Sequence, residues 1–153
     1  MEKEKTIEVL NSLITINNDR IEGYETASKE TDEMDLKNIF SKLAATSLKC
    51  KQELINEVTK LGGTAAEGTK TTGKFFRAWM DVKAALTGKD RKAILNSCEY
   101  GEDQAVATYD DALMNNLSDL NEEQQKLVKA QHDLIKVDHD KVKGMRDMLV
   151  TQH

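Results

Sequence analysis

The chain has 153 residues, of which 39% are hydrophobic, 32% are charged and 5% are aromatic, and it contains no proline. This length supports one domain with a buried core, and the composition argues against a β-sandwich and favours long helices, whose interiors exclude proline. The formal net charge is −5, with 22 basic residues scattered singly among 27 acidic ones, which argues against nucleic acid as a partner.

The expected location follows from the N-terminal segment and the thiols. Residues Met1–Lys5 carry charges of both signs without an apolar core, which argues against a signal peptide, and no run approaches the length of a membrane span. Cys50 and Cys98 are far apart and are expected to be reduced thiols. We therefore expect a cytoplasmic protein with no membrane partner.

The first half of the chain has the hydrophobic spacing of two long helices. One helix is predicted over residues 3–29, where apolar side chains recur at steps of three and four, and a second over residues 32–61. Thr31 or Asp32 suits the N-cap of the second helix, and Gly62 suits a left-handed residue directly after it. Because few residues separate the two helices, they are expected to pack antiparallel.

The second half contains a long connector and two further long helices. Residues 64–73 are small and polar, and a short amphipathic helix is predicted over residues 74–87. Long helices are predicted over residues 91–115 and 120–150, joined by a tight turn. Gly101 stands in an acidic stretch inside the first of these, where glycine costs about 1 kcal/mol relative to alanine. Its presence there indicates a packing or functional requirement.

Four long helices in two antiparallel pairs predict an all-α fold, a ferritin-like four-helix bundle that forms one domain over residues 1–153. The segment from Gly62 to Gly88 is long enough to cross the bundle, so the second and third long helices are expected to be parallel and diagonal to each other. In the up-down-up-down alternative, a short loop would suffice and these two helices would be antiparallel neighbours.

The chain lacks the sequence pattern of an intact di-iron centre. Such a centre takes a Glu from each of two helices and a Glu-x-x-His pair from each of the other two. None of the three histidines follows a glutamate by three residues. A degenerate carboxylate and histidine site for iron or zinc stays open, and its candidate ligands are Glu57, Glu99, Glu102 and His139.

Several polar residues are expected at one level near the middle of the bundle. Glu102 follows Cys98 by four residues and so lies on the apolar stripe of its helix. The helical rise of about 1.5 Å per residue brings polar positions of the other helices to the same level. These positions are Asn17, Asn18, Ser47 and either Asp138 or His139. In the structural interpretation they form a hydrogen-bonded layer, and replacing Glu102 with leucine is expected to be tolerated.

Four runs of residues resemble those of a known family, and they are Leu61–Gly63, Arg77–Trp79, Lys83–Asp90 and Gly101–Asp103. From about Asn18 to Asp147, the chain resembles uncharacterised bacterial four-helix-bundle proteins grouped with the ferritin-like superfamily as a domain of unknown function. The resemblance implies a ferritin-like bundle without an established activity. The family's recurrent polar positions correspond to Glu57, Arg77, Trp79, Glu99, Glu102, Asp103 and His139. Many relatives have histidine where this chain has Phe76, which argues against a metal or redox role there.

Two functional hypotheses from different classes follow. Because no complete catalytic signature is present, the favoured hypothesis is a non-enzymatic, stress-associated protein that acts by association with itself, as a dimer, or with a protein partner. The competing hypothesis is a metal-binding or oxidative-stress protein that uses iron or zinc. Arg77 and Trp79 on the connector helix are assigned to the structure, with Trp79 covering the core.

Overall fold

The computed structural model describes residues 2–67 and 91–151. These residues form long helices and one short 3₁₀ helix, and they contain no strand. The elements are α1 (Glu2–Glu30), α2 (Met34–Lys60), α4 (Arg91–Asn115), η1 (Leu117–Asp119) and α5 (Glu122–Thr151). Each long helix begins and ends within two residues of its predicted range. The helix predicted over 74–87 lies outside the described residues.

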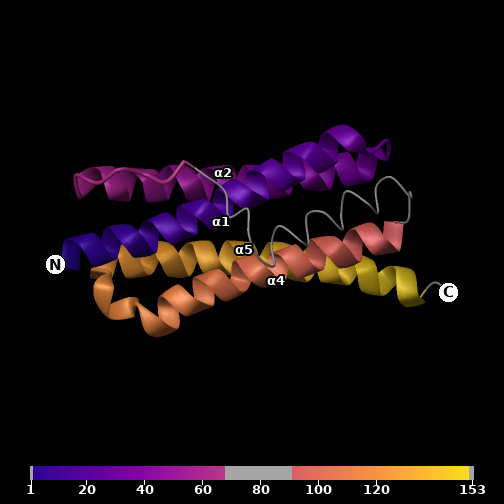
Figure 1. The fold of residues 1–153 in the computed structure, drawn as a ribbon. Coiled ribbons are helices and arrows are strands. Elements are labelled where there is room, and N and C mark those ends of the chain that lie inside the picture. The colour runs from indigo at the N-terminus through magenta and orange to yellow at the C-terminus, as the bar shows by residue number, and fades with distance from the viewer. Residues whose placement is uncertain (1, 68–90, 152–153) are drawn as a thin grey trace.

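The four long helices are arranged as two antiparallel hairpins (Figure 1). Helix α1 packs along α2, and α4 packs along α5. The hairpins meet through fewer contacts, between α1 and α4 and between α2 and α5. The described residues therefore form an all-α bundle in which α2 and α4 are diagonal.

The directions of the helices follow from contacts at their ends. Arg91, at the start of α4, forms ion pairs with Glu33 at 3.1 Å and with Asp35, both at the start of α2. At the other end of the bundle, the hydroxyl of Thr6 donates a hydrogen bond to the carbonyl of Asp119, just after α4. Helices α2 and α4 are therefore parallel, as the length of the connector predicts, and the up-down-up-down alternative does not fit.

The sequence explains where α2 ends better than where it begins. Its N-cap is Glu33 rather than Thr31 or Asp32, and the Thr31 hydroxyl instead accepts a hydrogen bond from the Glu33 N–H at 3.3 Å. Directly after the helix, Gly62 has a φ of 76°, a left-handed conformation that favours glycine. A Cβ atom on Gly63 would lie 2.7 Å from Ile7 Cδ1, so this glycine lets the chain pass close to α1.

Helix α5 begins with a reciprocal capping box. The N–H of Gln124 donates to Asn121 Oδ1 at 2.8 Å, and the N–H of Asn121 donates to Gln124 Oε1 at 3.0 Å. These bonds satisfy backbone donors that the first turn of a helix leaves without partners. The capping box and η1 explain why α5 begins at Glu122 instead of residue 120.

Two hydrophobic clusters fill the bundle at different levels. One contains Leu10, Leu13, Leu54, Val128 and Ile135, and the other contains Leu36, Phe40, Leu43, Leu95 and Val142. Each fully buried aliphatic side chain stabilises the fold by roughly 1.5–3 kcal/mol. Between the clusters, at mid-bundle, lies a set of buried polar side chains from all four long helices.

Within the described ranges, no helix combines the length and apolar character that a membrane span requires.

Candidate functional site

The centre of the bundle contains a buried arginine. Arg20 of α1 is fully buried, and its Nη2 donates to both oxygens of Glu102 of α4, at 2.7 and 3.0 Å. Its Nη1 donates to the hydroxyl of Ser47 of α2 at 2.5 Å. Glu102, which is also fully buried, accepts a further hydrogen bond of 2.6 Å from the Tyr24 hydroxyl. We call Arg20, Tyr24, Ser47, Glu102 and Asp138 the arginine layer.

Asp138 brings α5 into the arginine layer, with its Oδ2 at 3.3 Å from Arg20 Nη2. Burial by itself would lower the pKa of Arg20, but Glu102, Tyr24 and Asp138 together hold it above its usual value. Burial raises the pKa of Asp138, and Arg20 opposes that rise. The layer thus holds a permanently charged guanidinium against two carboxyl groups, and every long helix contributes a side chain.

The arginine layer does not fit the di-iron centre of a carboxylate bundle. The inward acids that would bind cations instead accept hydrogen bonds from a guanidinium, which fills the space between them. The described chain also places no histidine in this layer. The central acids therefore serve packing and charge balance.

A second polar layer lies next to the first. The Tyr109 hydroxyl accepts a hydrogen bond from Asn17 Nδ2 at 2.9 Å and donates one to Gln131 Oε1 at 2.7 Å. Gln131 Nε2 then donates to the Cys50 carbonyl and to Glu53 Oε1, both at 3.1 Å. The single layer expected from helical rise is therefore divided between two layers.

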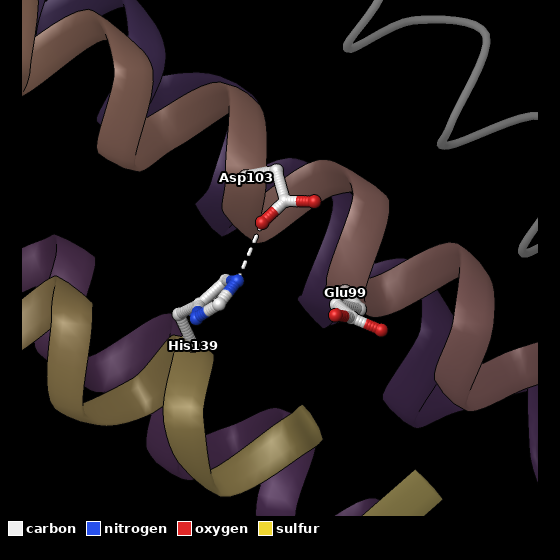
Figure 2. A group of neighbouring side chains, drawn as sticks. All are labelled: Glu99, Asp103 and His139. Carbon is white, nitrogen blue, oxygen red and sulfur yellow. Dashed lines mark hydrogen bonds and ion pairs between the residues drawn. The ribbon is translucent and has the colours of Figure 1, made fainter.

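A third polar group lies on the surface between α4 and α5, and we call it the seam cluster. It consists of Glu99 and Asp103, one turn apart on α4, and His139 on α5, which points toward them (Figure 2). One side-chain donor atom from each residue lies within 4.8 Å of the other two. His139 Nε2 lies 2.5 Å from Asp103 Oδ1. The sequence spacing of four residues aligns the two acids on one face of α4.

His139 is held from both sides. Its second ring nitrogen, Nδ1, lies 3.1 Å from Oδ1 of Asp140. Because carboxylates only accept, both contacts are hydrogen bonds only when both ring nitrogens carry protons. The His139 contact and a bond to Lys136 lower the pKa of Asp140. Asp140 is therefore an anionic partner that orients the imidazole toward the seam cluster.

The seam cluster has an open side and a closed side. The Asp103 side chain is 53% exposed, whereas that of Glu99 is 13% exposed. Glu99 also forms an ion pair with Nη1 of Arg146, which lies about two helical turns after His139 on α5. Solvent can therefore reach the cluster through Asp103, while Glu99 is shielded and already has a cationic partner.

A similar histidine stands seven residues earlier on α5. His132 Nε2 lies 2.7 Å from Asp110 of α4, and its Nδ1 lies 3.3 Å from Asp133. One turn before Asp110 the chain has Val106 in place of an acid, whereas one turn before Asp103 it has Glu99. The two histidines share the same local arrangement, and within the described ranges only His139 has a third oxygen donor close by.

The structure brings together only some of the metal ligands that the sequence predicted. Glu99 and His139 come together, and Asp103 joins them. Glu102 lies on the adjacent, buried face of α4, in the arginine layer. Glu57 lies elsewhere, near the end of α2, and pairs with Lys60 at 3.0 Å.

The predicted polar residues also occupy different places. Ser47 and Asp138 belong to the arginine layer, and Asn17 belongs to the layer of Tyr109. Asn18 is directed to the segment after α2, with its Nδ2 at 3.5 Å from the Ala66 carbonyl. Arg77 and Trp79 lie outside the described residues.

Sequence reasoning missed Arg20 as a core residue. Helical periodicity carries a signal for it, since steps of three and four connect Leu10, Leu13, Asn17, Arg20, Tyr24 and Ala27. Arginine is almost never fully buried unless it is paired, so the charge of Arg20 favoured a position on the surface. Asp103 was present only as a polar position implied by the resemblance, and Asp140 carried no signal apart from following a histidine.

Among the clefts lined by described residues, two lie away from the seam cluster. One, of about 520 Å³, is lined at the end of the bundle by residues that include Lys3, Lys60 and Asn121. The other, of about 290 Å³, lies between α1 and α4 beside Ser12 and Thr108. Neither includes a residue of the seam cluster.

A protein-family model described as a domain of unknown function (DUF2383) matches residues 5–115, from the first turns of α1 to the last residue of α4. This match covers more than half of the chain and agrees with the domain of unknown function that the signature runs indicated. No curated protein matches the chain. The family description assigns no activity, so the function has to be argued from the residues.

Proposed function

Because this chain belongs to the DUF2383 family, a domain of unknown function, we propose its role from its own geometry: a ferritin-like bundle that binds a divalent metal ion at the seam cluster. The ligands are Glu99 and Asp103 of α4 and His139 of α5. The ferritin-like assignment is supported by two antiparallel hairpins whose second and third long helices are parallel.

The observation that carries the proposal is the convergence of three donor atoms within 4.8 Å of one another. Around a tetrahedral zinc ion, donors at about 2.0–2.1 Å from the metal are about 3.4 Å apart. Rotation of the side chains can supply the remaining contraction, because Asp103 is exposed and Glu99 lies on the same helix face.

The donor types select the class of ion. One imidazole nitrogen and two carboxylate oxygens suit a first-row divalent ion such as zinc or iron(II), and they suit calcium and magnesium less well. Asp140 on the second ring nitrogen is the kind of outer partner that metal-bound histidines commonly have. Three protein ligands leave at least one position for water.

Metal binding at the seam cluster has to displace a proton. His139 Nε2 contacts Asp103 through a hydrogen bond, whereas a metal ion needs the lone pair of that nitrogen. Asp140 can retain the proton on Nδ1. The affinity is therefore expected to fall as the pH is lowered, because protons and metal compete for the same nitrogen.

Titration calorimetry with zinc, and with iron(II) under anaerobic conditions, tests the proposal. The wild-type protein should bind one ion per chain, and His139→Ala should lose at least tenfold in affinity. His132→Ala is the matched control, since it removes an imidazole in the same Asp-His-Asp arrangement that lacks the third oxygen donor. Absence of stoichiometric binding, or an equal loss in both variants, would contradict the site.

A second candidate, non-enzymatic association with another copy of the chain, is favoured by three exposed apolar residues on α5. Leu134, Val137 and Met148 are exposed and lie on one face of the helix by their spacing, with Val137 64% exposed. Light scattering after size exclusion tests this candidate. Val137→Lys should dissociate such a dimer, whereas Leu48→Lys on α2 should not. A monomeric wild-type protein at high concentration rules it out.

A further inference from the structure

We propose that Arg146 is a latch on the seam cluster: its guanidinium competes with the metal ion for the Glu99 carboxylate and so sets the affinity of the site. This inference rests on the proposed metal binding and names its regulation. It begins from the fact that Glu99 serves two partners, because it is both a member of the donor cluster and the ion-pair partner of Arg146.

Arg146 continues a regular series of contacts between α4 and α5. His132, His139 and Arg146 are spaced by seven residues, which places them on one face of α5. Their partners on α4 follow in the opposite order as Asp110, Asp103 and Glu99. Two members of the series are imidazoles, and the third is a permanent cation. The seam therefore has a built-in positive charge next to the proposed metal position.

A metal ion and the Arg146 guanidinium are two cations attracted to the same carboxylate, so each weakens the attraction of Glu99 for the other. The Glu99 side chain is 13% exposed and that of Arg146 is 25% exposed, so their interaction is partly shielded from water. A divalent ion at the cluster would also repel the guanidinium. This repulsion acts even if the metal ion and Arg146 take different oxygens of Glu99, so metal binding should favour withdrawal of Arg146 from Glu99.

The withdrawal is made easier by a second partner of Arg146. Its Nη2 donates to Oδ1 of the neighbouring Asp147 at 3.0 Å, and the Asp147 side chain is 55% exposed. When Glu99 turns to a metal ion, the guanidinium can keep Asp147 and gain water. The closed state, seen in this structure, thus has both contacts, and the proposed open state keeps the contact with Asp147 without Glu99.

The first test replaces Arg146 with methionine, which retains the apolar stem and removes the charge. Arg146→Met should bind zinc about fivefold more tightly than the wild type, as expected for the loss of a competing, partly exposed ion pair. Lys143→Met is the control, because it removes one positive charge from an exposed position one turn away. It should change the affinity less than twofold. Arg146→Lys, which keeps the charge and loses the planar fork, should lie in between.

The second test uses Asp147 in a double-mutant cycle. Asp147 is the partner that remains in the open state, whereas Glu99 also holds the guanidinium in the closed state, so Asp147→Asn should destabilise the open state more. It should therefore weaken zinc binding in the wild type by about twofold to threefold and have a smaller effect in Arg146→Met. Equal effects in both backgrounds would mean that Asp147 acts only through its charge and would overturn the two-state latch.

The outcomes separate the latch from the site itself. If neither the wild type nor Arg146→Met binds zinc, the proposed metal site is wrong and the latch falls with it. If the wild type binds zinc and Arg146→Met and Arg146→Lys bind it equally or more weakly, the site stands and the latch is wrong, since Arg146 then only positions Glu99.

Discussion

Glu102 and Asp103 are neighbours on α4 with opposite environments. Glu102 is fully buried and accepts hydrogen bonds from Arg20 and Tyr24, whereas the Asp103 side chain is 53% exposed and contacts His139. Both are carboxylates next to a nitrogen donor of another helix. Only the second can exchange its partner for water or a metal ion at low cost. Burial therefore assigns one acid to the fold and leaves the other available for binding.

The largest expected effect is the loss of a partner in the arginine layer. Glu102→Leu leaves the Arg20 guanidinium buried without its main counterion, so we expect it to destabilise the protein by about 3–5 kcal/mol. Urea denaturation measures this loss. This expectation reverses the tolerance inferred from sequence, because the buried partner is Arg20, whose burial was not predicted.

A double variant sharpens the same test. Arg20→Met combined with Glu102→Leu removes both charges and should recover most of the stability lost in Glu102→Leu, since a buried ion pair can often be replaced by apolar residues of similar volume. A single Glu102→Leu variant that loses less than about 1 kcal/mol would show that the pair is not buried as described.

The buried layers also protect the two thiols. Burial raises the pKa of Cys50 from 9.0 to about 11, and burial followed by the nearby Glu102 raises the pKa of Cys98. Two pKa units lower the thiolate fraction of Cys50 at pH 8 about hundredfold. Ellman's reagent should therefore react slowly with the native protein and rapidly in guanidinium.

The sign of the pH dependence follows from the same shift. A thiol whose pKa is higher in the folded state resists ionisation there, so the free energy of unfolding should fall as the pH rises from about 9 toward 11. Cys50→Ala should show a smaller fall in the free energy of unfolding over this pH range.

A ready Cys50–Cys98 disulfide in the native protein would contradict the parallel arrangement of α2 and α4, because it requires Cα atoms within about 7 Å.

A smaller effect is expected in the neighbouring uncharged layer. Tyr109→Phe leaves Asn17 Nδ2 and Gln131 Oε1 without this shared partner, which should cost about 1–3 kcal/mol. Thermal unfolding measures the change. Tyr100→Phe, at an exposed position on the same helix, is the control and should leave the melting temperature nearly unchanged.

The smallest effect on stability is expected at the seam. Asp103→Asn weakens an exposed contact with His139 and should change the free energy of unfolding by less than about 1 kcal/mol. It should nevertheless abolish tight zinc binding, because it removes an anionic ligand. A large loss of stability in Asp103→Asn would show that Asp103, like Glu102, is needed for the fold, which would contradict the comparison.

The sequence by itself determined the helices and their directions. Hydrophobic periodicity and the absence of proline predicted all four long helices to within two residues at either end. The length of the segment after α2 predicted that α2 and α4 are parallel. These features depend on local propensity and chain length, which a single sequence contains.

Only the tertiary structure decided which polar residues meet. Helical rise places residues at a common level to within about a turn, but contact also depends on how each helix is rotated about its axis. Arg20 therefore reaches Glu102, while Glu99 and Asp103, on another side of α4, reach His139. The pairing of a buried charge is a property of several helices together, and no one helix's sequence contains it.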